Sequence, residues 1–154
     1  MELKVNVLVD FDFEKISSKL LSLAQASLGV WAYSYIRQTQ TDVEKKNLFI
    51  SRTGTLLRSI QAIPEGKLGI RIGVFAEYGK YLEFGTKSYI IKPKNRKALK
   101  IPVNGYGYVF TKKVKHPGIR ERGWFLGSFE ERSQVANQEM REYFKQGLIR
   151  IGET

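Results

Sequence analysis

The residues that this chain lacks limit the chemistry that its side chains could perform. Its 154 residues contain one histidine, His116, and no cysteine. Disulfides, thiolate nucleophiles and cysteine metal sites are therefore excluded, and a single imidazole with no acid near it in the sequence offers neither a metal site nor an acid–base pair. Within Lys115-His116-Pro117-Gly118, the histidine is expected to shape a turn or a contact. We predict no enzymatic activity and no cofactor.

Glycines and carboxylates also lack a catalytic pattern. Gly69 and Gly73 fit neither the Walker nor the Rossmann spacing, so no phosphate-binding loop is predicted. Glu130 and Glu131 stand near the expected start of a helix, where acids suit the helix dipole. These acids are therefore assigned to a solvated helix face.

Charge, in contrast, singles out one segment. The formal net charge is +11, and residues 87–122 hold eleven lysines and arginines against one acid, Glu121. This segment therefore carries +10, and the other 118 residues carry +1. A near-neutral body with one basic segment is expected to present that segment to an acidic partner.

The candidate interface residues lie within this basic segment. They are Lys92, Lys94, Arg96, Lys97, Lys100, Lys112, Lys113, Lys115 and His116. Aromatic side chains at Tyr89, Tyr106, Tyr108 and Phe110 alternate with them, and such a mixture can stack on bases while the cations hold phosphates. Alternate aromatics in a hairpin also serve as ordinary packing, and no known nucleic-acid-binding motif is present. Nucleic acid, an acidic protein surface and a solvated loop all stay open as interpretations.

The first half of the chain predicts strands around a long helix. Residues 2–9 and 67–74 alternate between apolar and polar side chains, which is typical of half-buried strands. Between them, apolar residues recur at steps of three and four and predict a helix over residues 13–36, capped by Asp10 or Asp12. The polar residues 37–52 are expected to follow its end.

The second half predicts a short helix, a β-arm and a final helix. Residues 76–84 fit a short helix in which Tyr78, Tyr81, Leu82 and Phe84 pack inward, and Gly85 caps its end. The basic segment predicts short strands at Tyr89–Ile91 and Ala98–Val103, a turn at Asn104-Gly105 and a returning strand over Tyr106–Val114. An apolar stripe that starts at Trp124 and Phe125 predicts a helix over residues 124–147.

These elements predict one α+β domain over residues 1–154. We expect an antiparallel β-sheet packed against a long N-terminal helix and a C-terminal helix, with residues 87–122 as a long, basic and partly mobile arm inserted before the last helix. Neither a basic leader with an apolar stretch nor an apolar run of about 20 residues is present, so we expect a soluble chain with no membrane partner.

Three stretches together resemble one family of virion proteins. Residues 52–60, Arg-Thr-Gly-Thr-Leu-Leu-Arg-Ser-Ile, resemble its R-T-G-x-L-x-x-S-I signature, and residues 77–86 resemble its Y-A-x-Y-V-E-F-G-T signature. Residues 91–99 and 114–118 match its I-x-P-K…K-A-L…V-x-H-P-G run. The matching motif positions are Thr53, Gly54, Leu56, Ser59, Tyr78, Tyr81, Glu83, Phe84 and Gly85. The family is that of the tailed-bacteriophage head–tail joining and tail-completion (neck, minor tail) proteins.

This resemblance implies a structural protein of the virion neck. The chain would assemble as a ring that joins the DNA-filled head to the tail, with the adaptor or tail-terminator ring as neighbour and DNA nearby. It would be a monomer in isolation, and it would be assembled in the host cytoplasm. In that setting, Tyr81 and Phe84 would anchor the short helix, and Gly85 would turn the chain into the arm. Two alternatives stay open: a small basic nucleic-acid-binding protein that uses the 87–122 arm, and a metal-independent endoribonuclease toxin.

Overall fold

The computed structural model describes residues 1–6, 18–103, 105 and 107–152. The fold class is α+β, as predicted. The elements, in chain order, are β1 (Glu2–Asn6), α1 (Ser18–Lys45), α2 (Thr55–Arg58), β2 (Ile60–Glu65), β3 (Gly69–Val74), α3 (Gly79–Phe84), β4 (Tyr89–Ile91), β5 (Leu99–Val103), β6 (Gly107–Thr111), β7 (Val114–His116) and α4 (Phe129–Gly152).

A three-stranded antiparallel sheet in the order β1-β3-β2 forms one layer of the body. The predicted alternation of residues 67–74 is confirmed, because Ile70, Ile72 and Val74 are buried against α1 and its neighbours. The outer face of the sheet is charged: Arg71 donates to Glu2 at 2.9 Å, and Lys4 donates to Glu65 at 3.0 Å. Hydrophobic burial on one face and solvation on the other therefore fix the register of β3.

The sequence pattern missed strand β2. Pro64-Glu65-Gly66 indicated only a turn, yet Ile60–Glu65 pairs along its whole length with β3. The proline is tolerated because β2 is an edge strand, where one missing N–H donor need not break the pairing with the next strand.

Helix α1 is longer at its C-terminal end than predicted. It continues to Lys45, although residues 37–52 were expected to lie beyond it. The polar residues there stay helical because they face a second helix: Thr39 and Val43 are buried, Arg37 pairs with Glu139, and Asp42 pairs with a buried arginine. The predicted caps Asp10 and Asp12 lie outside the described residues.

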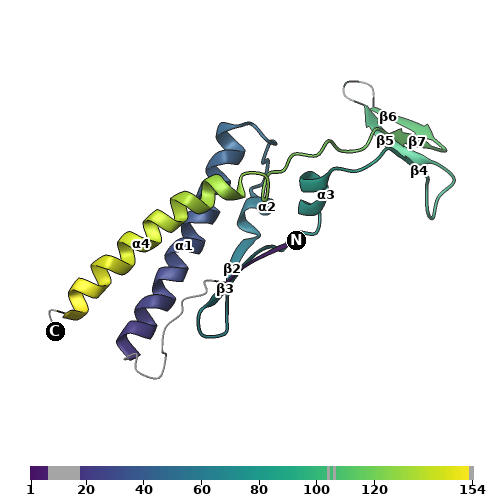
Figure 1. Cartoon of the computed structure of the whole chain (residues 1–154). Coiled ribbons are helices and arrows are strands. Elements are labelled where there is room, and N and C mark those ends of the chain that lie inside the picture. The colour runs from purple at the N-terminus through teal and green to yellow at the C-terminus, as the bar shows by residue number, and fades with distance from the viewer. Residues whose placement is uncertain (7–17, 104, 106, 153–154) are drawn as a thin grey trace.

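Helix α4 lies alongside α1 and runs in the opposite direction (Figure 1). Lys46, just beyond the end of α1, contacts Ser128 and Glu131 near the start of α4, whereas Leu23 lies against Gly147 near its end. The helix begins at Phe129, not at residue 124 as predicted. Trp124 and Phe125 precede it and are fully buried, so they are core residues of a turn.

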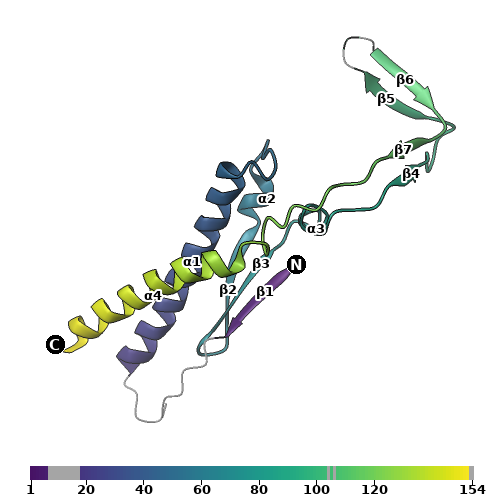
Figure 2. The same cartoon turned by 45° about the horizontal axis from the view of Figure 1, so that its top comes forward.

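The basic segment extends away from this body as a long arm (Figures 1 and 2). Both views show α3 at its base and the β5–β6 hairpin at its far end, with the helix pair on the opposite side of the molecule. In the described part of the chain, no helix has the length and apolar character needed to cross a membrane.

Candidate functional site

The arm is a ribbon of two antiparallel chains that bends in the middle. Next to the body, β4 pairs with β7 and an isolated bridge joins Thr86 to Ile119. Farther out, β5 pairs with β6. The predicted strand Tyr89–Ile91 is present with those bounds, whereas the predicted returning strand over residues 106–114 is interrupted at Lys112 and Lys113. Asn104 and Tyr106 at the predicted turn lie outside the described residues.

The predicted interface cations are all exposed. Lys92, Lys94, Arg96, Lys97, Lys100, Lys112, Lys113 and Lys115 belong to this set. Among the described residues, none of them forms an ion pair within the chain. Lys100 places its ammonium 3.8 Å from the centroid of the Tyr108 ring, a cation–π contact on the surface of the hairpin. The arm therefore presents its positive charge to solvent and to partners.

His116 is only half exposed and has local partners. Its Nδ1 accepts a hydrogen bond from the Gly118 N–H at 3.0 Å, and its ring stacks on Tyr89 with centroids 4.8 Å apart. Because Nδ1 is an acceptor, the proton of the neutral ring lies on Nε2. This geometry orders the turn at Pro117-Gly118 and the pairing of β4 with β7.

The two faces of the β5–β6 hairpin differ in chemistry. Residues that pair directly share a face, so Ile101 and Val109 lie on one face with Leu99, Val103 and Thr111. The pairs Lys100–Phe110 and Pro102–Tyr108 lie on the other face. Tyr108, Val109 and Phe110 expose 58%, 51% and 67% of their surface, because no second layer covers either face. One face is thus aliphatic, and the other is aromatic and cationic.

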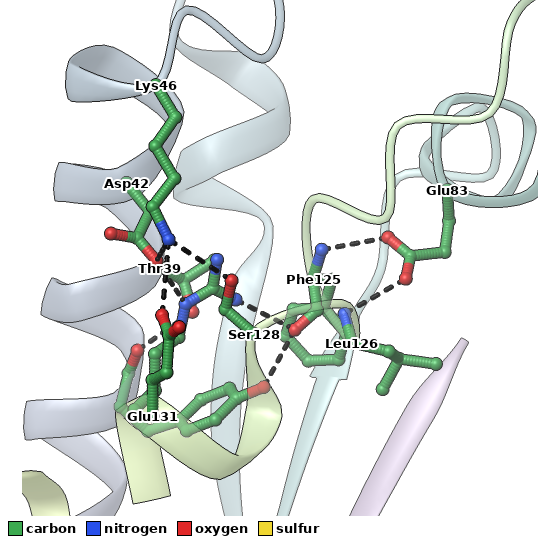
Figure 3. A network of polar contacts seen from close by, with 10 residues as sticks. Thr39, Asp42, Lys46, Glu83, Phe125, Leu126, Ser128 and Glu131 are labelled. Carbon is green, nitrogen blue, oxygen red and sulfur yellow. Dashed lines mark hydrogen bonds and ion pairs between the residues drawn. The ribbon is translucent and has the colours of Figure 1, made fainter.

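At the base of the arm, the aromatic residues of α3 face outward, opposite to the prediction, whereas Leu82 packs against the core as predicted. Tyr78, Tyr81 and Phe84 are exposed, whereas Gly79 and Glu83 face the interior. The carboxylate of Glu83 explains the inversion, because it accepts hydrogen bonds from two backbone N–H groups that are otherwise unpaired: Phe125 at 2.8 Å and Leu126 at 2.9 Å (Figure 3). The prediction that Tyr81 and Phe84 anchor this helix is therefore wrong; its anchor is Glu83.

Glycines let the segments at this base approach one another closely. A Cβ on Gly79 would lie 2.8 Å from Val74 and 3.1 Å from Leu56. Gly85 adopts φ +69°, and a Cβ there would lie 2.6 Å from the Ile119 carbonyl oxygen. The predicted role of Gly85, a sharp turn at the end of α3 into the arm, is confirmed.

The first motif stretch also ends at this base. Gly54 adopts φ +68° before α2, and Thr53 contacts Thr55 through its hydroxyl, so the predicted tight entry to the short helix is confirmed. Leu56 is buried beside Gly79, and the Ser59 hydroxyl donates to the Leu56 carbonyl at 2.7 Å.

A buried polar network joins this base to the helix pair (Figure 3). The Phe125 carbonyl accepts hydrogen bonds from the Tyr35 hydroxyl at 2.7 Å and from Arg132 at 2.9 Å. Arg132 also donates to Asp42 at 2.8 Å, and Lys46 lies 3.5 Å from the same carboxylate. Burial raises the pKa of the Tyr35 phenol above its usual value of 10.0, although the nearby Arg132 acts in the opposite direction.

Sequence reasoning missed the central residues of this network. Tyr35 belongs to the apolar stripe that predicted the first helix, and Arg132 directly follows Glu130 and Glu131 near a helix start, so neither position stood out in the sequence. The one available signal was the spacing of Gly79 and Glu83, four residues apart on the same side of a short helix. Asp42 and Arg132 are 90 residues apart, so no local pattern could have paired them.

The arrangement as a whole combines a hydrogen-bonded base with an arm that exposes cations and apolar side chains. Comparison of the chain with protein-family models, with curated proteins and with solved structures found no match in any of the three.

Proposed function

We propose that this chain is a non-enzymatic structural protein of a tailed-phage virion. In this proposal it forms a ring at the neck that joins the DNA-filled head to the tail, at the level of a tail-completion or head–tail connector protein. It is a monomer in isolation, is assembled in the host cytoplasm, and has the adaptor or tail-terminator ring as neighbour. The proposal starts from the three motif stretches that resemble the head–tail joining family.

The observation that carries the proposal is the place where these stretches meet. Leu56 from the first stretch and Gly79 from the second lie side by side, and Gly85 of the second lies against Ile119. A Cβ on Gly118, which belongs to the third stretch, would lie 2.2 Å from the Thr86 carbonyl oxygen. The motifs thus build the base of the arm, and none contributes a nucleophile there. Motifs that stabilise the base of an extended arm suit a structural protein that uses this arm to contact a partner.

The surface of the arm supports a role in assembly. An isolated two-stranded ribbon is marginally stable in water, and this one leaves Tyr108, Val109 and Phe110 largely exposed. Tyr108 and Phe110 share one face of the hairpin, and exposed apolar side chains gathered on one face mark an interaction site. The surrounding cations make an acidic or neutral protein surface the suitable partner.

Complementation of a phage that lacks this gene tests the proposal. The arm variant carries four charge reversals: Lys94→Glu, Arg96→Glu, Lys97→Glu and Lys100→Glu. Like charges brought together in an interface cost several kcal/mol, so this variant should yield filled heads and separate tails with few joined particles. Its unfolding free energy should stay within about 0.5 kcal/mol of the wild type, since the four side chains are exposed.

A body variant with the same change in charge serves as the control. It carries four reversals at exposed positions outside the arm: Lys67→Glu, Arg141→Glu, Lys145→Glu and Arg150→Glu. This variant should complement the phage. Normal infectious yield from the arm variant would refute the proposal, and equal loss from both variants would show that net charge, not the arm, matters.

One observation favours a second function, the binding of single-stranded nucleic acid. Lys100, Tyr108 and Phe110 share one face of the hairpin, and aromatic side chains beside cations provide a stacking platform for bases. Affinity for an oligonucleotide should then fall steeply with salt and should be lost on Tyr108→Ala. Binding that is weak, or unchanged by Tyr108→Ala, would leave nonspecific charge attraction as its only source.

A further inference from the structure

The exposed apolar side chains of this protein are concentrated in one quarter of the sequence. Among the described residues, sixteen large hydrophobic side chains are exposed, and ten of them lie between residues 75 and 110. Four of these ten lie on the far hairpin of the arm, four lie in or next to α3 at its base, and the other two, Tyr89 and Ile90, lie between them on β4. Exposed apolar side chains that are concentrated in this way mark interaction sites, so we expect each group to contact a partner.

The group on α3 forms a continuous aromatic stripe. Tyr78, Tyr81 and Phe84 follow one another at steps of three residues, so they lie on one side of the helix, opposite Gly79 and Glu83. They expose 46%, 45% and 61% of their surface. We call these three side chains the α3 patch. Its orientation is fixed, because the buried Glu83 carboxylate holds α3 to the turn before α4.

The arm of the same chain does not cover this patch. Both views show the β5–β6 hairpin directed away from α3 (Figures 1 and 2). Seventeen residues separate Gly85 from Pro102, which pairs with Tyr108, so a straight strand would place the hairpin up to roughly 55 Å from the patch. Each surface is therefore available to another molecule.

We propose that the hairpin of one copy docks on the α3 patch of a second copy. This inference rests on the proposed function, and it names the partner of the arm. Docking through the aromatic face of the hairpin would cover Tyr108 and Phe110 together with Tyr81 and Phe84, so that aromatic side chains of both groups lose contact with water at one interface. The contact joins two different surfaces, and repetition of such a contact around an axis closes a ring.

Charge selects the patch over a second arm. Each arm carries +10, so two arms side by side repel one another. The exposed charges next to the patch are Glu77 and Lys80, together with Lys87, Arg120, Glu121 and Arg122 where the arm meets the end of α3. They add up to +2, far below the +10 of an arm. Lys80 lies 5.2 Å from the Tyr81 ring centroid, and Lys100 lies 3.8 Å from that of Tyr108. Aromatic rings on both surfaces already accept ammonium groups, and lysines of an incoming arm suit the same geometry.

Site-specific cross-linking tests this inference. Because the chain has no native cysteine, each introduced cysteine is the only thiol in its chain. An isotope-labelled Tyr108→Cys chain is mixed with an unlabelled Tyr81→Cys chain, and disulfide formation is followed by mass spectrometry. In the proposed function the isolated chain is a monomer at low concentration, so the protein is used at roughly 0.1 mM, where docked pairs form. Docking holds the two thiols at an effective concentration in the millimolar range, and the mixed bridge should then form up to about tenfold faster than without docking.

Two other exposed tyrosines provide matched controls. Tyr33→Cys lies on α1, and Tyr143→Cys lies on α4 near other exposed apolar residues. Each should bridge to the arm cysteine at the undocked rate. Addition of Phe84→Ser to the Tyr81→Cys chain should slow its bridge to that same rate.

Three results would overturn the inference: equal rates at all three positions, a faster bridge to Tyr143→Cys, or a preference for bridges between two arms. The phage experiment separates this failure from failure of the proposed function. If reversing the arm charge blocks joining while the 81–108 bridge forms no faster than the controls, the arm acts in assembly on a different protein.

Discussion

Replacement of Glu83 tests how firmly the arm is held to the body. This carboxylate exposes 3% of its surface and accepts the N–H groups of Phe125 and Leu126 at 2.8 and 2.9 Å. Glu83→Ala removes both acceptors and leaves two buried donors without partners. Glu83→Gln keeps one acceptor oxygen but places an amide NH₂ against the second donor.

The expected losses follow from the number of unpaired donors. A buried donor without a partner costs about 1–3 kcal/mol, so two of them give a loss of roughly 2–6 kcal/mol for Glu83→Ala. Glu83→Gln leaves one such donor and should lose about 1–3 kcal/mol. The order of the two variants, alanine below glutamine below wild type, is the part of the prediction that depends most directly on the geometry.

Urea unfolding followed by tryptophan fluorescence measures these free energies. Trp124 lies next to the affected backbone and is fully buried, so its emission reports the same region. Glu77→Ala is the matched control, since Glu77 is exposed and should change stability by no more than about 0.5 kcal/mol. If Glu83→Ala is as stable as this control, Glu83 is not the anchor of α3.

The remaining predictions concern a glycine, a tyrosine and the arm. Gly118→Ala should lower the unfolding free energy, measured in urea, by about 2–4 kcal/mol, because φ is +92° and the added Cβ would lie 2.2 Å from a backbone oxygen. Gly66 has φ +64° but open space around it, so Gly66→Ala should lower the unfolding free energy by only about 1–2 kcal/mol. Equal losses in the two variants would show that the close approach at Gly118 is unimportant. The pKa of Tyr35 is raised in the native state, so the contribution of its neutral phenol to stability should be complete below about pH 10 and decline above it. As the pH rises above this value, the urea midpoint should therefore decline less for Tyr35→Phe than for the wild type. Identical dependence of the two midpoints on pH would contradict the raised pKa. Limited trypsin digestion should cut first between Lys87 and Arg122, where the backbone has no packed layer beside it; a first cut within Ser18–Lys45 would contradict this.

Local patterns in the sequence predicted the elements that have one face exposed to solvent and the other packed against the core. Strand β3 alternates because its inner residues meet α1 and its outer residues meet solvent. Glu130 and Glu131 lie in the first turn of α4, where the helix dipole favours them, as predicted. The arm strand Tyr89–Ile91 also has its predicted bounds, since β-branched and aromatic residues favour paired extended chain.

The pattern of apolar and polar residues gave wrong predictions where polar side chains are buried. Hydrophobicity assigned the aromatic residues of α3 to the interior, but Glu83 lies there instead, because its carboxylate accepts hydrogen bonds from two N–H groups that have no other partner. Polar residues with hydrogen-bond partners are also the reason that the last turns of α1 were not predicted, since Thr39 and Asp42 form hydrogen bonds within the α1–α4 helix pair. Such bonds join residues up to 90 positions apart, and no short window contains both partners.

Charge and apolar surface have different effects on what the arm can bind. At physiological salt, the field of its cations is screened within about 8 Å, so it guides encounters and rejects like-charged surfaces more than it holds a complex together. Tight contact must come from the exposed side chains around Phe110, which gain only when a partner excludes water from them. A basic arm without these apolar residues would suit any polyanion. An apolar arm without the charge would pair with its own copies. The combination favours docking on a surface that has apolar side chains and far less positive charge than the arm itself, and we propose the α3 patch as that surface.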